Sequence, residues 1–107
     1  MTQTLRGEIN SIVKQLVAYY HPQKIILFGS AARGDAQPDS DLDFFIVKSG
    51  VDDLPGYERY RQIASFLPST TAIDALVYMP YEVKKRLYLR DPFVLNVMKE
   101  GKVLYGA

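Results

Sequence analysis

The sequence has no cysteine and only one histidine, His21. Without cysteine the chain cannot form a disulfide, use a thiolate nucleophile, or bind zinc or iron through sulfur. A single histidine is also a poor basis for a zinc site, because zinc is held by several protein ligands. His21 lies beside Pro22, so we expect it at a helix end or in solvent rather than in a metal centre.

The sequence also lacks a strong charge of either sign. It contains 13 Lys and Arg residues against 12 Asp and Glu residues, a formal net charge of +1. Dedicated nucleic-acid-binding proteins show a basic excess, so we expect no direct nucleic-acid partner. No apolar run is long enough to span a bilayer, and the opening residues "MTQTLRGEIN" contain no apolar signal core. We therefore expect a cytoplasmic protein with no membrane partner and with access to nucleoside triphosphates and magnesium.

The pattern of apolar residues predicts one small domain that spans residues 1–107, without repeats or internal linkers. Helices are expected over residues 3–20, 30–34, 57–67 and 80–90, and from an N-cap at Asp91 to a terminator at Gly101. Strands are expected over residues 24–28, 41–48, 70–79 and 102–105, with turns or loops over residues 34–40 and 49–56. This order predicts an α/β or α+β domain in which a small mixed sheet is flanked by helices.

Acidic residues interrupt two of the predicted strands. Asp41 and Asp43 begin the strand "DLDFFIVK", and Asp74 lies inside the apolar segment "AIDALVY". Residues two apart on a strand point to the same face, so Asp41 and Asp43 would repel each other unless a cation neutralised them. If the two strands are neighbours, the three acids converge. Three carboxylates can hold two magnesium ions about 4 Å apart, an arrangement that serves phosphoryl and nucleotidyl transfer.

Structural roles for the same acids stay open. Asp41 alone is better explained as a turn residue, and Asp43 or Asp74 could instead pair with an arginine or lysine. Ten residues separate Asp41 from the preceding pair Gly29-Ser30. This pair could be a plain turn. It could also hold phosphate oxygens, because glycine permits a close backbone approach and a following helix offers free amides.

The segment "GSAARGDAQPDSDLD" combines Gly-Ser, ten intervening residues and Asp-x-Asp. This motif resembles that of the DNA polymerase beta-like nucleotidyltransferase superfamily, and the whole chain is similar to minimal nucleotidyltransferases of the MntA type. The resemblance implies a nucleotidyltransferase fold in which Asp41 and Asp43 bind Mg²⁺, with Asp74 as the third catalytic and metal-binding acid. It also implies that Gly29 and Ser30 bind the nucleoside triphosphate. For Arg33, contact with the triphosphate and pairing with a nearby acid both remain possible.

The same resemblance implies a function. MntA-type proteins are antitoxins that transfer AMP from ATP to a tyrosine of a HEPN-family ribonuclease toxin. We therefore expect a Mg²⁺-dependent protein adenylyltransferase that uses ATP and forms a hetero-oligomer with such a toxin. Two alternatives are a non-catalytic module that neutralises the toxin by binding, and the core of a small-molecule nucleotidyltransferase of the aminoglycoside type.

Aromatic residues are plentiful, with eight tyrosines and five phenylalanines. Such residues are enriched in protein interfaces, which would suit the binding-module alternative. Tyr60, Tyr78 and Tyr88 lie in periodic segments, however, and burial or half-burial is the favoured interpretation for them. The basic residues Lys84, Lys85 and Arg86 are expected on a solvated helix face.

Overall fold

The computed structural model describes residues 3–36, 40–51, 53–68 and 71–106. Four strands form one sheet in the order β3-β2-β1-β4. The strands are β1 (Lys24–Phe28), β2 (Leu42–Val47), β3 (Ile73–Tyr78) and β4 (Lys102–Tyr105). The helices are α1 (Gln3–Tyr20), α2 (Gly29–Arg33), α3 (Gly56–Ala64), α4 (Pro80–Tyr88) and α5 (Pro92–Glu100). Strand β1 is antiparallel to β2 and β4, whereas β2 and β3 are parallel, which confirms the predicted mixed sheet.

The predicted elements agree closely with the observed ones. The first helix and the strands at residues 24–28 and 102–105 have the predicted bounds. The short second helix begins and ends one residue earlier than predicted, and α3 begins one residue earlier and ends three residues earlier. The other elements are one to three residues shorter at one end or both. Asp91 caps α5 as predicted, because its carboxylate accepts hydrogen bonds from the amides of Phe93 and Val94. Parts of the predicted segments over 34–40, 49–56 and 70–79 fall outside the described residues.

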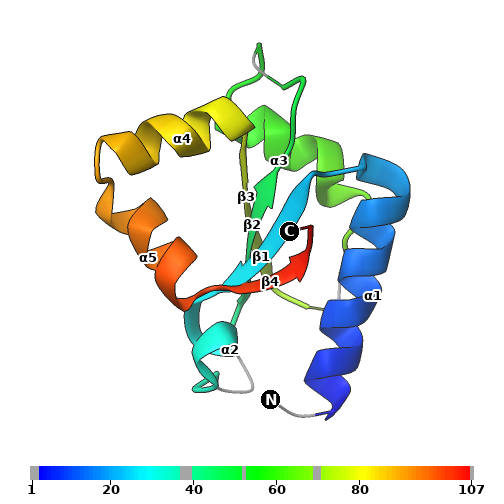
Figure 1. The fold of residues 1–107 in the computed structure, drawn as a ribbon. Helices are drawn as coiled ribbons and strands as arrows, with labels where there is room; N and C mark the ends of the chain where they lie inside the picture. Colours follow the sequence, from blue (N-terminus) through cyan, green and yellow to red (C-terminus); the bar gives the residue numbers. More distant parts are fainter. Residues whose placement is uncertain (1–2, 37–39, 52, 69–70, 107) are drawn as a thin grey trace.

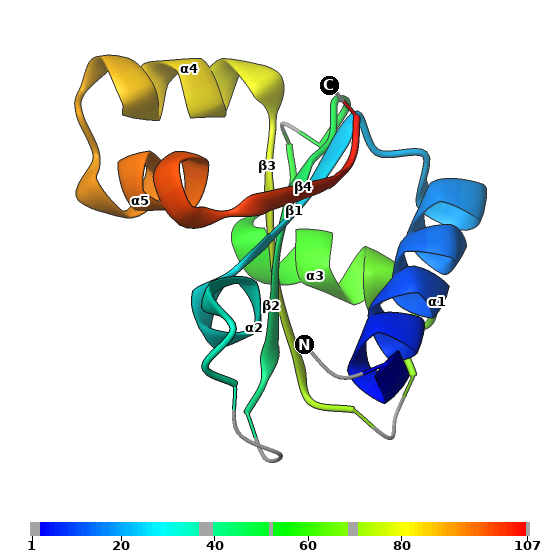
Figure 2. The same cartoon turned by 60° about the horizontal axis from the view of Figure 1, so that its bottom comes forward.

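Helices cover both faces of the sheet. Helices α1 and α3 lie on one face and α4 and α5 on the other, while α2 lies at one end of the sheet (Figures 1 and 2). Side chains on successive strand residues alternate between the two layers. Leu42, Phe44 and Ile46 of β2 join the core beneath α1 and α3, whereas Phe45 and Val47 join a second core beneath α5. Strand β2 is therefore apolar on both faces because both faces are covered.

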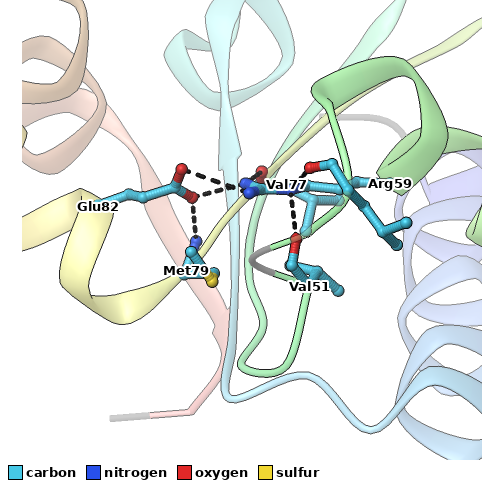
Figure 3. A network of polar contacts seen from close by, with 6 residues as sticks. Val51, Arg59, Val77, Met79 and Glu82 are labelled. Atoms are coloured by element: carbon cyan, nitrogen blue, oxygen red, sulfur yellow. Dashed lines mark hydrogen bonds and ion pairs between the residues drawn. The ribbon is translucent and has the colours of Figure 1, made fainter.

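One buried arginine ties α3 to β3 and α4. The Arg59 side chain donates hydrogen bonds to the carbonyl oxygens of Val51, Leu54 and Val77 at 3.2, 2.9 and 3.1 Å. Its guanidinium also pairs with the Glu82 carboxylate at 2.6 Å, as Figure 3 shows. Glu82 in turn accepts a hydrogen bond from the amide of Met79, at the start of α4. These contacts compensate the buried charge and hold the first turn of α4 against the sheet.

The sequence did not indicate the burial of Arg59, and the interpretation of one tyrosine is corrected. Tyr60 and Tyr78 are half-buried as expected, but Tyr88 is 86% exposed at the end of α4. Lys84, Lys85 and Arg86 lie in solvent as predicted. In the described part of the chain, no helix is both long enough and apolar enough to cross a membrane.

Candidate active site

The register of the sheet brings two of the predicted acids side by side. Asp43 of β2 pairs with Asp74 of the parallel strand β3, so the two strands are neighbours as the site required. On its other side Asp43 pairs with Phe28, the last residue of β1. Since Asp43 alternates with Leu42 and Phe44, it points to the sheet face that α5 covers. Asp41 and Asp74 are exposed and Asp43 is half-buried, so the site opens to solvent at this end of the sheet.

The carboxylates repel one another. The pKa of Asp43 is raised above its ordinary value, first by burial and then by the negative charges of Asp74 and Asp41, while the Arg33 charge partly opposes the rise. Within the described residues, no hydrogen bond or ion pair reaches Asp41, Asp43 or Asp74 from a basic side chain. The interpretation of Asp43 and Asp74 as partners of arginine or lysine is therefore not supported.

The Gly-Ser pair approaches the same carboxylate. Gly29 has a φ of 74°, a left-handed conformation that glycine adopts without strain. A side-chain carbon at Gly29 would collide with the Asp43 carboxylate. Ser30 follows in the first turn of α2, whose N-cap residue Phe28 makes no side-chain hydrogen bond to it. The backbone of the turn thus lies directly beside Asp43, and the amides of a first helical turn are the groups that bind phosphate oxygens.

Arg33 lies in the last turn of α2. Its Nε is 3.3 Å from Oδ2 of Asp35, and both side chains are largely exposed. The observed contact of Arg33 is thus pairing with an acid, and contact with the triphosphate stays a prediction. An exposed pair of this kind is weak, which leaves the guanidinium free to change partners when a ligand binds.

The three acids have the oxygen donors that Mg²⁺ prefers, and their mutual repulsion is the electrostatic condition that a cation relieves. As their side chains lie, however, no group of three or more His, Cys, Asp or Glu residues among those described is close enough to hold a metal ion. The register confirms that the strands carrying the acids are adjacent. Metal binding itself stays a prediction.

Comparison with known proteins agrees with this geometry. A family model described as a nucleotidyltransferase domain matches residues 7–104. The chain belongs to this family. It is a nucleotidyltransferase, and one relative from Methanocaldococcus jannaschii carries the provisional name protein adenylyltransferase. That relative is 35% identical over 101 residues, which cover 91% of this chain and 94% of the relative.

Solved structures share the nucleotidyltransferase fold. A crystal structure from Sulfolobus solfataricus, provisionally named a nucleotidyltransferase, has a TM-score of 0.65 at 20% identity and covers 99% of this chain and 89% of its own. A toxin-antitoxin complex with AMP-PNP has a TM-score of 0.60 at 25% identity, covering 92% of this chain and 73% of its own. A point mutant of the toxin-antitoxin pair MntA-HpeT has a TM-score of 0.58 at 26% identity, with 92% and 72% covered. The predicted relation to MntA-type nucleotidyltransferases is thereby confirmed.

Sequence reasoning missed the aromatic side of the site. Phe28 precedes Gly29 and lies opposite Asp43, and Phe93 of α5 packs against Phe28 with ring centroids 5.5 Å apart. Phe28 could have been found, because it directly precedes the Gly-Ser pair. No local signal identifies Phe93, because its position depends on how α5 packs on the sheet.

Proposed function

We propose that this nucleotidyltransferase is a Mg²⁺-dependent protein adenylyltransferase that transfers AMP from ATP to a tyrosine of a HEPN-family ribonuclease toxin, and so acts as an antitoxin. The observation that carries the proposal is the register that sets Asp43 between Asp74 on one side and the end of β1 on the other. A turn suited to phosphates and a pair of acids suited to a cation thus meet at one end of the sheet.

Similar proteins support the identity of the substrates. The relative that shares 35% identity is named for protein adenylyl transfer. The complex crystallised with AMP-PNP, an ATP analogue, is described as a toxin-antitoxin. We extend both features to this chain: ATP as the donor, and a toxin protein as the acceptor and hetero-oligomeric partner.

The proposed reaction is an in-line substitution at the α-phosphorus of ATP. The tyrosine oxygen of the partner attacks this phosphorus, the bond to the bridging oxygen of the β-phosphate breaks, and pyrophosphate leaves. Asp74, exposed beside Asp43, accepts the proton of the hydroxyl. The amides at Gly29 and Ser30 hold the phosphate oxygens, and Arg33 exchanges Asp35 for the triphosphate.

Asp41, Asp43 and Asp74 would hold the magnesium, as two ions when the site is filled. When bound, Mg²⁺ would neutralise charge on the phosphates and on the three acids. The repulsion that raises the pKa of Asp43 would then be relieved. This predicts that the fold is more stable with Mg²⁺ than without it.

The test is incubation of the purified protein with ATP, magnesium and the protein encoded by the neighbouring gene, followed by mass analysis of that protein. We expect a mass gain of one or more adenylyl groups, and no gain with an Asp41→Asn, Asp43→Asn double variant. Asp53→Asn, which removes an exposed acid in the loop before α3, is the matched control and should leave the gain unchanged.

A tryptic map of the modified protein would identify the acceptor residue as a tyrosine. If the partner is neutralised equally well by the wild type and the double variant, with no mass gain in either, the chain is a binding module. The adenylyltransferase proposal would then be wrong.

A further inference from the structure

Aromatic rings flank the carboxylates on the sheet face covered by α5. Phe28 is the β1 residue opposite Asp43, and Phe45 lies two residues after Asp43 on the same face of β2. Phe93, in the first turn of α5, contacts both rings. Its ring centroid lies 5.5 Å from that of Phe28 and 6.4 Å from that of Phe45. Phe93 therefore lies over two side chains that border Asp43.

Phe93 is the accessible member of this group. Phe45 is fully buried and stacks on Tyr78 with centroids 4.7 Å apart, while Phe28 and Tyr78 are half-buried. Phe93 is 39% exposed. Its ring meets Phe28 at 83° and Phe45 at 47°, and among the described residues no aromatic ring lies parallel on it. Part of the Phe93 ring thus remains exposed next to the side chains that border Asp43.

We propose that Phe93 stacks against the base of the nucleoside triphosphate whose phosphates bind at Gly29 and Ser30. The proposal rests on the proposed function, because it takes a nucleoside triphosphate as the ligand. An exposed aromatic ring at the edge of a phosphate site offers the flat apolar contact that the face of a nucleobase requires. Every base has such a face, so Phe93 adds affinity for the nucleoside without selecting one base over another.

A purely structural role for Phe93 is the competing explanation. Its contacts with Phe28 and Phe45 also pack α5 onto the sheet. Two substitutions separate the roles. Phe93→Leu keeps an apolar side chain for packing but removes the flat ring, whereas Phe93→Tyr keeps the ring. Tyr19→Ala is the control. Tyr19 lies in α1, on the opposite side of the sheet, is 63% exposed, and stacks on Phe66 with ring centroids 5.5 Å apart.

The experiment is titration calorimetry of the full chain with magnesium and either AMP-PNP or inorganic tripolyphosphate. Stacking on one base is worth about 1–3 kcal/mol, so Phe93→Leu should weaken AMP-PNP binding by roughly 5- to 150-fold. Phe93→Tyr and Tyr19→Ala should bind AMP-PNP like the wild type. Tripolyphosphate has no base, so its affinity should be the same in all four proteins.

Three results would overturn the inference: wild-type affinity for AMP-PNP in Phe93→Leu, equal loss in Phe93→Leu and Phe93→Tyr, or equal weakening of AMP-PNP and tripolyphosphate. Failure of the proposed function looks different. A wild type that binds AMP-PNP but transfers no AMP would overturn the proposed function alone. The affinities of the Phe93 variants for AMP-PNP would still show whether Phe93 stacks on the base. A wild type that does not bind AMP-PNP would overturn both.

Discussion

Gly29 and Gly34, at the two ends of α2, provide a matched pair of perturbations of the site. Both have positive φ angles, 74° and 85°. An alanine at either position is therefore strained by about 1–2 kcal/mol. The two sites differ in their surroundings. A methyl group at Gly34 meets no atom of the described residues within 4 Å, whereas one at Gly29 collides with the Asp43 carboxylate.

The collision sets the expected difference between Gly29→Ala and Gly34→Ala. Forcing an extra carbon into a filled site costs about 1–3 kcal/mol, which adds to the backbone strain. The free energy of unfolding should therefore fall by about 1–2 kcal/mol in Gly34→Ala and by roughly 2–5 kcal/mol in Gly29→Ala. Gly29→Ala must also displace Asp43, and a shift of about 1 Å in a reacting group can lower a rate by about 100-fold.

Urea unfolding at neutral pH measures the first difference, and label transfer from ATP to the partner protein measures the second. Gly34→Ala should retain most of the transfer rate under conditions in which it is folded, and Gly29→Ala should lose about 100-fold or more. Equal unfolding midpoints for the two variants, or a transfer rate in Gly29→Ala that matches Gly34→Ala, would refute the close approach of Gly29 to Asp43.

Three further predictions concern charge. Burial and neighbouring acids raise the pKa of Asp43, so ionisation of Asp43 weakens the fold as pH rises above the ordinary pKa of an aspartate. Asp43→Asn should therefore be more stable than the wild type in urea at pH 7, and this gain should vanish near pH 3. Burial alone would raise the pKa of Glu82, but hydrogen bonds from Arg59 and from the amide of Met79 lower it below its ordinary value. The ionised Glu82 side chain therefore stabilises the fold at neutral pH, and this stabilisation is lost in acid. Acid unfolding followed by circular dichroism should show this loss in the wild type and not in Glu82→Gln. Arg59→Met should lower the free energy of unfolding by about 2–4 kcal/mol, because Glu82 and three carbonyl groups lose their donor. Asp91→Ala removes two hydrogen bonds from the start of α5 and should lower the free energy of unfolding by about 1 kcal/mol. An unchanged urea midpoint would contradict the observed cap.

Local sequence signals were sufficient for most elements of this fold. The spacing of apolar residues by three and four positions predicted the helix α1, and Pro22 indicated where it ends. The apolar run at residues 44–47 is typical of a strand that is covered on both faces, as β2 is. Asp91 followed by Pro92 identified the start of α5, because that pair satisfies the requirements of a helix N-terminus.

Long-range pairing could not be predicted in the same way. The sequence placed Asp43 and Asp74 in strands, but only the register shows that they are direct partners. Tyr88 has a helical spacing typical of burial, yet it is the last residue of α4 and is 86% exposed. Arg59 looks like any exposed helix residue until the carbonyl groups of the loop before α3 and of β3 are seen around it. Such features depend on contacts between distant parts of the chain, which no local pattern contains.

The most direct test of the account uses ATP labelled at either the α- or the γ-phosphate. The protein is incubated with magnesium, each labelled ATP and the protein encoded by the neighbouring gene, and label in that protein is counted. The α-label should be retained on the partner, the γ-label should leave with pyrophosphate, and Asp43→Asn should abolish transfer of the α-label. Retention of the γ-label would show phosphorylation instead. Transfer that survives in Asp43→Asn would contradict the assignment of the site.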